Sequence, residues 1–280
     1  MTDQEIKGEF QASGGIKLAS RAWQIPSPRA RLLITHGFGE HCGRYKQLAK
    51  DLNAQGISVH AWDLRGHGKS PGIRGHVDSF NDYYADLHEF RHFVAELQPS
   101  VPIFLFGHSL GGLITFRYVQ DFLPAGVRGV ILSSPFIGIA IDLPKIKLLA
   151  SKILKLVVPR LTLYNELNAT LLSHDPSIAE AYDSDPLVHH RASSAWFYNF
   201  LAEAKKTTEQ ASEWNLPIAV LYAGSDQIVS VDATEKVCSA IDSELLTQKR
   251  YEDFYHEIFN EVKRDQPLAD LISWMDQRLK

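Results

Sequence analysis

The stretch that most constrains how this chain can fold is a short turn between an apolar segment and a helical one. Residues 103–106 are apolar and predict a buried strand, and GHSLG follows at 107–111. Apolar residues then recur at helical spacing as far as Gln120. This order predicts a nucleophile elbow, a strained strand-to-helix turn that presents its central residue, Ser109, at the end of a strand. Its two glycines let the strand and the helix pass close together.

Size and composition narrow the class of protein. The chain has 280 residues, of which 45% are hydrophobic and 22% are charged, and these values fit one large α/β domain with an insertion. A net charge of -4 offers no basic field to a polyanion, so we expect no nucleic-acid partner. The N-terminus lacks the pattern of a signal peptide, and no apolar run is long enough to span a membrane. These features predict a cytoplasmic protein.

The sequence offers no pattern for a metal or another cofactor. Cys42 and Cys238 are the two cysteines, far apart in the chain, and we expect both to be free thiols. The histidines are scattered, and the HEIFN segment lacks a second ligand at helical spacing. We therefore expect chemistry that needs no metal or other cofactor.

Strand-like segments alternate with helical ones along most of the chain. After a hairpin around residues 13–15, the strand-like segments are 31–35, 57–64, 103–106, 127–132, 216–222 and 246–251. Such alternation predicts a mostly parallel sheet with helices on both faces, in which ligands gather at the carboxyl ends of the strands.

The alternation is interrupted between the strands at 127–132 and 216–222. About eighty residues that look helical lie there, too many for one crossover, so part of them must be an insertion. We expect a core from residues 1–134 and 196–280 and a helical cap from residues 135–195.

Part of this insertion has a basic, amphipathic character. Residues 141–163 mix aliphatic side chains with Lys145, Lys147, Lys152, Lys155 and Arg160. One interpretation is a lid whose apolar face packs on the domain while the lysines face solvent. The other is a lid that also makes transient contact with a membrane surface.

A serine hydroxyl becomes a good nucleophile only when an imidazole takes its proton and an acid orients that imidazole. In a fold with this elbow the acid precedes the histidine in the chain. Asp226 follows the strand-like segment 216–222, and His256 follows the segment 246–251. We therefore expect Ser109, Asp226 and His256 to form a catalytic triad.

Other acids and histidines fit structural tasks better. Asp63 precedes the serine in the chain and is expected to stabilise its own loop, and Asp185 is expected to cap or turn the end of the insertion. His36 and His108 flank the expected pocket, but neither follows the acid. We expect both to be hydrogen-bonding structural residues.

Acyl transfer also needs donors for the negative charge that develops on the carbonyl oxygen. The backbone N–H of Leu110 follows the nucleophile, and the N–H of Phe38 lies in a glycine-rich turn after the strand at 31–35. These two groups fit the two-donor scheme of an elbow of this kind.

Six motifs together resemble those of a known family. They are HGFGEHCGRY at 36–45, DLRGHGKSPG at 63–72, GHSLGG at 107–112, AYDSDPLV at 181–188, GSDQIV at 224–229 and YHEIFNE at 255–261. The chain resembles the α/β-hydrolase superfamily and, more narrowly, the monoacylglycerol lipases and related lysophospholipases. The resemblance implies a mostly parallel sheet of about eight strands, the triad and oxyanion hole named above, and a helical cap over a pocket for one acyl chain.

The resemblance also implies residues that contact the substrate. Glu40 and Arg44 would organise a polar entrance, and Tyr182 from the cap would lie near the exit for glycerol. Read from the residues alone, Glu40 and Arg44 fit an i,i+4 surface ion pair at a helix start equally well. One position departs from the family, because Phe259 stands where these lipases often carry a second histidine.

The expected activity is hydrolysis of a single-chain lipid ester, most simply a monoacylglycerol, through an acyl-enzyme. A lysophospholipase, a short-chain carboxylesterase or a thioesterase on the same scaffold is the alternative among enzymes. A catalytically silent ligand-binding protein is the alternative outside them.

Overall fold

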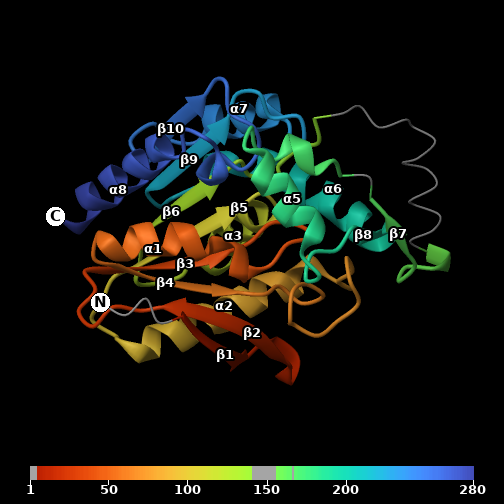
Figure 1. Cartoon of the computed structure of the whole chain (residues 1–280), viewed down its shortest axis with the longest axis horizontal. Helices are drawn as coiled ribbons and strands as arrows, with labels where there is room; N and C mark the ends of the chain where they lie inside the picture. The colour runs from red at the N-terminus through yellow and green to blue at the C-terminus, as the bar shows by residue number, and fades with distance from the viewer. Residues whose placement is uncertain (1–4, 141–155, 166) are drawn as a thin grey trace.

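The computed structural model of the chain describes residues 5–140, 156–165 and 167–280. Its centre is an eight-stranded sheet in the order β1-β2-β4-β3-β5-β6-β9-β10 (Figure 1). The eight strands are Glu5–Gln11 (β1), Lys17–Trp23 (β2), Ala30–Thr35 (β3), Ile57–Trp62 (β4), Ile103–His108 (β5), Val127–Ser133 (β6), Ile218–Ala223 (β9) and Leu246–Tyr251 (β10). Strands β3, β4, β5, β6, β9 and β10 run parallel, whereas β2 is antiparallel to both of its neighbours. The predicted fold, a mostly parallel sheet of about eight strands, is confirmed.

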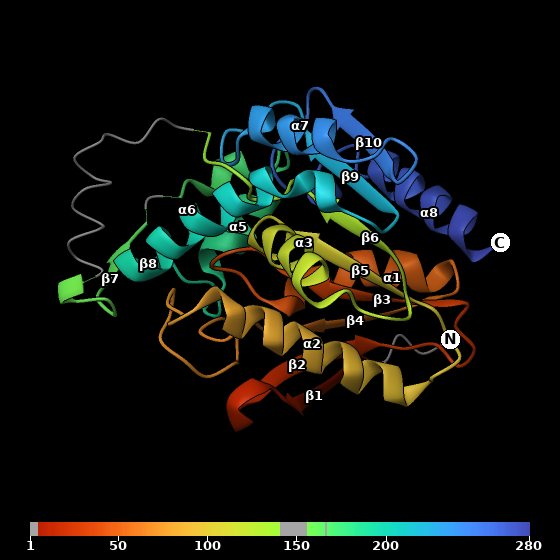
Figure 2. The ribbon, with the colours of Figure 1, turned by 180° about the vertical axis from the view of Figure 1, so that it is seen from behind.

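Helices cover both faces of the sheet, as Figures 1 and 2 show from opposite sides. Their bounds are Lys46–Ala54 (α1), Phe80–Leu97 (α2), Leu110–Phe122 (α3), Pro176–Ser184 (α5), Ser194–Glu209 (α6), Val231–Ala240 (α7) and Asp265–Leu279 (α8). Helices α1 and α8 pack on one face, and α2, α3, α6 and α7 pack on the other.

Alternation along the strands explains why two separate cores form. Successive side chains of a strand point to opposite faces, so Leu33 and Leu105 join the core under α2 and α3. Their neighbours Leu32 and Phe104 join the core under α1 and α8. Because both faces are covered, these strands are apolar at nearly every position.

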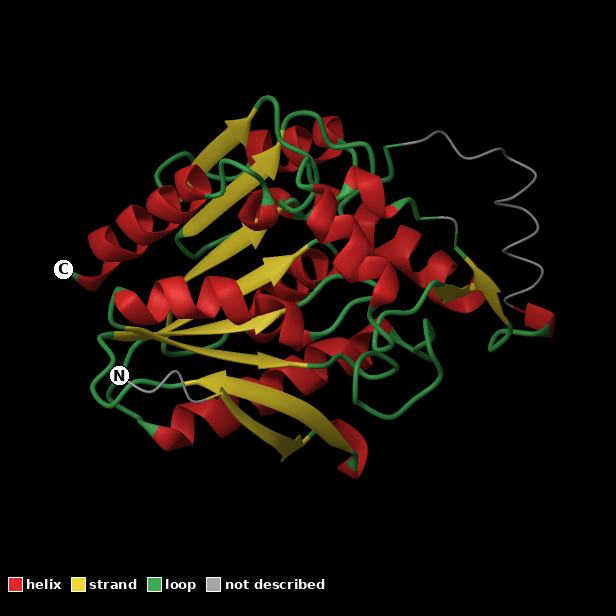
Figure 3. Cartoon of the chain, in the orientation of Figure 1, coloured by secondary structure: helices red, strands yellow, loops and turns green. Residues whose placement is uncertain are grey.

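The parallel strands point toward the part of the chain that lies between β6 and β9 in sequence. Helices α5 and α6 lie at this end of the sheet, beside a small two-stranded sheet of Thr162–Tyr164 (β7) and Arg191–Ser193 (β8) (Figure 3). Helix α6 begins at Ser194, so the expected boundary between residues 195 and 196 falls in its first turn. The core and the described part of the insertion therefore meet at the carboxyl end of the sheet.

The structure describes only part of the basic stretch that was predicted to form a lid. Most of the basic stretch at 141–163, including Lys145, Lys147, Lys152 and Lys155, lies outside the described residues. Arg160 is described, and its exposed guanidinium pairs with Asp78 at 3.1 Å.

Within the described ranges, no helix is long and apolar enough to cross a membrane. Cys42 and Cys238 are both buried free thiols.

Candidate active site

The predicted elbow has the backbone that its motif requires. Ser109 joins β5 to α3 with φ 52° and ψ -117°, a conformation that few residues other than glycine adopt. A Cβ atom at Gly107 would lie 2.3 Å from the carbonyl oxygen of Gly111, and one at Gly111 would lie 2.0 Å from that of Thr35. Only glycine fits at these two positions, because each faces backbone atoms that cannot move aside.

The predicted acid and base meet at the carboxyl end of the sheet. Asp226 follows β9 and His256 follows β10, and Nδ1 of His256 lies 2.7 Å from Oδ2 of Asp226. The other carboxylate oxygen of Asp226 accepts hydrogen bonds from the N–H groups of Ile228 and Val229, both at 2.9 Å. The side chains of Asp226 and His256 are almost completely buried. The pair is therefore held in one orientation from both sides.

Each partner changes the pKa of the other. Burial alone would raise the pKa of Asp226, but His256 and the two N–H donors hold it below its usual value. Burial alone would lower the pKa of His256, but the Asp226 carboxylate raises it above 6.5. An imidazole in this setting can accept a proton and then hold it next to a carboxylate.

Ser109 and His256 line the same cavity, which has a volume of about 790 Å³ including its open mouth. Its wall is largely apolar, formed by Phe38, Phe136, Leu167, Leu172, Trp196 and Ile228 among others. Polar side chains gather near Ser109, where Glu40, Arg44 and Tyr182 also line the cavity. The site thus combines a reactive polar end with an apolar space large enough for an alkyl chain.

The second predicted donor, the N–H of Phe38, lies in the turn after β3. The backbone N–H groups of Phe38 and Leu110 donate no hydrogen bond to any other described residue, and both residues lie next to the cavity or the elbow. The Gly37 N–H instead donates to Oε1 of Glu40 at 2.6 Å. A carboxylate therefore fixes the start of this turn, while the N–H of Phe38 stays available for a ligand.

The two flanking histidines have structural positions, as predicted. His36 accepts a hydrogen bond from the Leu64 N–H at 3.0 Å, and Nδ1 of His108 lies 3.1 Å from the carbonyl oxygen of Ser133. Burial lowers the pKa of His36, and burial together with His256 lowers that of His108 to about 4. Both imidazoles are therefore neutral at pH 7.

The interpretation of Glu40 and Arg44 as a surface ion pair is wrong. The Arg44 guanidinium lies 3.0 Å from Glu40 and also binds Glu257, at 2.6 and 2.9 Å. The side chains of Arg44, Glu40 and Glu257 are only 12%, 4% and 6% exposed. Burial alone would raise the pKa of Glu40, but Arg44 and two neighbouring histidines lower it to about 2. One cation thus joins two buried carboxylates beside the cavity.

Sequence reasoning missed Glu257 as a member of this network. Its place directly after His256 in the YHEIFNE motif was a usable signal, because a residue adjacent to the base must lie near the cavity. Phe259 lies further along the same segment and packs its ring on Phe106, with centroids 5.6 Å apart. It lines a smaller neighbouring cavity of about 340 Å³ rather than the cavity that contains Ser109.

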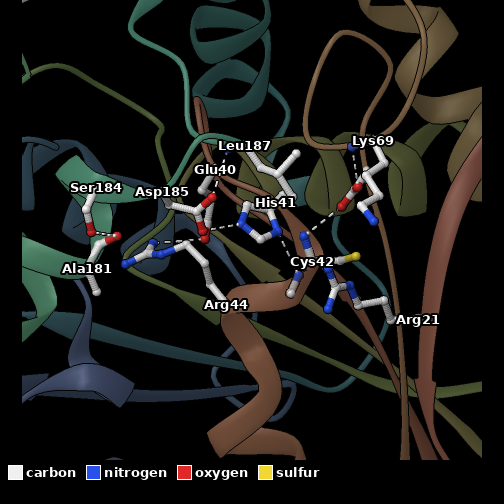
Figure 4. A network of polar contacts seen from close by, with 12 residues as sticks. Arg21, Glu40, His41, Cys42, Arg44, Lys69, Ala181, Ser184, Asp185 and Leu187 are labelled. Atoms are coloured by element: carbon white, nitrogen blue, oxygen red, sulfur yellow. Dashed lines mark hydrogen bonds and ion pairs between the residues drawn. The ribbon is translucent and has the colours of Figure 1, made fainter. Parts of the chain in front are cut away.

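The segment at 182–185 contacts the turn after β3 at two points. The Arg44 guanidinium lies 4.9 Å from the centre of the Tyr182 ring. Nε2 of His41 lies 2.8 Å from Oδ2 of Asp185, while Nδ1 of His41 accepts from the Gly43 N–H (Figure 4). Asp185 also accepts from the Leu187 N–H at 2.8 Å, which is the turn-forming position predicted for it.

Asp63 stabilises its own loop, as predicted. Its carboxylate accepts hydrogen bonds from the N–H groups of Cys42 and Lys69, both at 2.8 Å. Residues 5–140, 156–165 and 167–280 contain no group of three or more His, Cys, Asp or Glu side chains that could hold a metal ion.

Known proteins are similar to this chain in sequence. Residues 26–263 match the model of the family described as serine aminopeptidase, S33. The monoacylglycerol lipase of Mycolicibacterium smegmatis is 30% identical over 272 residues, with 96% of each chain covered. Phospholipase YtpA of Bacillus subtilis is 31% identical over 260 residues, covering 91% of this chain and 98% of that protein.

A solved structure is also similar to this chain. The crystal structure of Paleococcus ferrophilus monoacylglycerol lipase has a TM-score of 0.83 and 30% identity to this chain, and it covers 93% of this chain and 99% of its own. The fold, the sequence motifs and these relatives agree. The chain is a lipase- or esterase-type serine hydrolase of the α/β-hydrolase superfamily and belongs to the serine aminopeptidase S33 family.

Proposed function

We propose that this enzyme hydrolyses a monoacylglycerol, with Ser109 as the nucleophile, His256 as the general base and Asp226 as the residue that orients the base. The observation that carries the proposal is the buried Asp226–His256 pair, whose imidazole lines one cavity with a serine on a strained elbow. In this arrangement a neutral imidazole accepts the serine proton as the Ser109 Oγ attacks the acyl carbonyl carbon.

The remaining steps follow from the same groups. The N–H groups of Phe38 and Leu110 donate to the oxyanion of the tetrahedral intermediate, and loss of one such donor typically costs about 10²–10³ in rate. Protonated His256 gives its proton to the departing glycerol oxygen, which leaves an acyl-enzyme on Ser109. His256 then activates a water molecule, which releases the fatty acid and restores the serine.

The charge of the cavity wall favours an uncharged head group over a phosphate. Among the described residues that line this cavity, Arg44 is the one Lys or Arg, and its guanidinium is already bound to the carboxylates of Glu40 and Glu257. These three groups together carry a formal charge of about minus one, so a phosphate would meet net repulsion. Glu40, Arg44 and Tyr182 are suited to hydrogen-bond the hydroxyl groups of glycerol.

We further propose that residues 135–195 act as a cap that also contacts lipid surfaces. Beside the cavity-lining residues Asn165 and Leu167, one segment exposes large apolar side chains: Leu156, Val157, Leu161, Leu163 and Tyr164, which are 51–79% exposed. Exposed apolar side chains grouped in this way are typical of a surface that binds a membrane or another protein. Co-sedimentation with liposomes, compared between the wild type and Leu156→Ser/Val157→Ser, tests this contact.

The experiment that tests the catalytic proposal is labelling with a fluorophosphonate probe. We expect labelling of the wild type and of Ser239→Ala, which changes an exposed serine on α7, but none of Ser109→Ala. Turnover by Ser109→Ala should fall by roughly 10⁶-fold. Wild-type protein that stays unlabelled and hydrolyses no ester would instead identify a catalytically silent binding protein.

A second experiment tests the substrate class. Esters that share one acyl chain should be compared with glycerol, glycerophosphocholine and glycerophosphate head groups, together with a short acetate ester. We expect the glycerol ester to have the highest kcat/KM. A preference for the phospholipid would favour a lysophospholipase, and a preference for acetate would favour a short-chain esterase.

A further inference from the structure

The backbone on both sides of His256 is held by residues outside the proposed triad. The N–H of Tyr255 donates to Oε1 of Glu261 at 2.7 Å, and the N–H of Glu257 donates to the carbonyl oxygen of Leu172 at 2.8 Å. Leu172 belongs to the insertion between β6 and β9, and Glu261 follows the base on its own loop. The backbone is therefore fixed one residue before His256 and directly after it, by two different parts of the chain.

Glu261 is the centre of this arrangement. It is 3% exposed, and Oε1 also lies 2.8 Å from Nδ1 of His174. Oε2 accepts from the N–H groups of His174 and Val262 at 3.3 and 3.1 Å. A carboxylate can accept all four of these hydrogen bonds, whereas the amide of glutamine has a single acceptor oxygen and would bring two donors of its own.

His174 links Glu261 to the cavity. Its ring stacks on that of Tyr255 with centroids 3.8 Å apart, and it lies two residues after Leu172, which lines the cavity. Between them, Ser173 Oγ donates to the carbonyl oxygen of Asn260 at 2.9 Å. Residues 172–174 therefore contact the loop of the base at every position.

From this geometry we propose that Glu261 is a positioning residue for the general base, and that His174 holds it in place from the insertion. The proposal rests on the function proposed above, because it assigns a partner to His256. A base must lie within hydrogen-bond reach of the nucleophile, and a displacement of about 1 Å can cost about 10²-fold in rate. Glu261 restrains the peptide unit between Phe254 and Tyr255, one residue before His256, so its loss should misplace the imidazole rather than weaken substrate binding.

The test compares Glu261→Gln, His174→Ala and His174→Asn with Asp253→Asn, which alters an exposed carboxylate on the same loop. For a soluble nitrophenyl ester we expect Glu261→Gln and His174→Ala to lower kcat by about 10- to 100-fold while KM changes by less than about 3-fold. His174→Asn should recover most of the activity, because its amide N–H can occupy the place of the imidazole Nδ1–H. Asp253→Asn should match the wild type.

Two further measurements separate positioning from loss of stability. If the contact between His256 and Asp226 loosens, the pKa of His256 falls, so the acid limb of the kcat/KM profile should move to lower pH in Glu261→Gln and His174→Ala. The low-field proton NMR signal of the His256 Nδ1–H should shift or broaden in the same variants. His174 is 45% exposed, so its replacement provides the test if Glu261→Gln does not fold.

Each outcome has one meaning. Unchanged kcat, acid limb and NMR signal in His174→Ala and in folded Glu261→Gln would overturn the proposal. A wild type with no turnover and no labelling would overturn the proposed function, and the NMR signal would still report whether Glu261 positions His256. A lower kcat with an unmoved acid limb and an unmoved NMR signal would also overturn the positioning role of Glu261, because that result indicates a structural effect elsewhere.

Discussion

Replacement of Arg44 by methionine removes the guanidinium that joins two buried carboxylates, those of Glu40 and Glu257. All three side chains are at most 12% exposed, so water cannot take the place of the lost cation. We expect Arg44→Met to lower the free energy of unfolding by about 3 kcal/mol or more at pH 7.

The magnitude follows from the pKa of Glu40. Its folded-state pKa of about 2 lies below its ordinary value of 4.5, and this difference corresponds to about 3 kcal/mol for all the groups around Glu40 together, of which Arg44 lowers the pKa most and His108, His36 and the Gly37 N–H lower it less. Removal of one partner from a buried ion pair typically costs about 3–5 kcal/mol, which agrees. Because the folded-state pKa is the lower one, this stabilisation is fully present above pH 4.5 and is lost as the pH falls toward 2.

Urea unfolding followed by tryptophan fluorescence at pH 7.5 and at pH 4 measures the effect. The difference between wild type and Arg44→Met should be smaller at pH 4, where part of the stabilisation of ionised Glu40 is already lost. Lys205→Met is the control, because Lys205 and Glu209 form an exposed i,i+4 pair, and it should cost less than about 0.5 kcal/mol. A cost below about 1 kcal/mol for Arg44→Met, or one that is equal at both pH values, would refute the reasoning.

Two other expectations follow from the same geometry. Since Asp226 raises the pKa of His256, kcat/KM of the wild type should rise with pH through an inflection above pH 6.5. Asp226→Asn should move that inflection to lower pH and lower kcat by roughly 10⁴-fold. A wild-type profile that is flat from pH 6 to 8 would contradict this expectation. Gly111→Ala should destabilise the protein by about 2 kcal/mol or more in thermal unfolding, because its methyl group would lie 2.0 Å from the carbonyl oxygen of Thr35. The control Gly8→Ala should be tolerated, because the nearest atom to its methyl group would be 3.7 Å away. Equal melting temperatures for the two variants would show that the elbow can adjust.

The sheet, the elbow and the order of acid and base could be predicted from sequence because each depends on local patterns. An apolar run followed by GHSLG encodes a strand, a turn and a helix within twenty residues. Parallel strands end at one edge of a sheet, so residues that follow β5, β9 and β10 meet there although they are far apart in the chain. The proximity of Asp226 and His256 could therefore be predicted from the order of the strands alone.

The setting of the polar residues was decided by tertiary structure. Glu40 and Arg44 have the spacing of a surface pair, but Glu257, 213 residues away from Arg44, binds the same guanidinium and buries it. Glu261 closes the YHEIFNE motif, but its contacts could not be predicted from the sequence, because its four donors come from three separate residues. The sequence by itself determined which residues follow which strands. Which carboxylate each cation and each N–H group meets depended on how distant segments of the chain pack together in three dimensions, since a pattern within one segment carries no information about its distant partners.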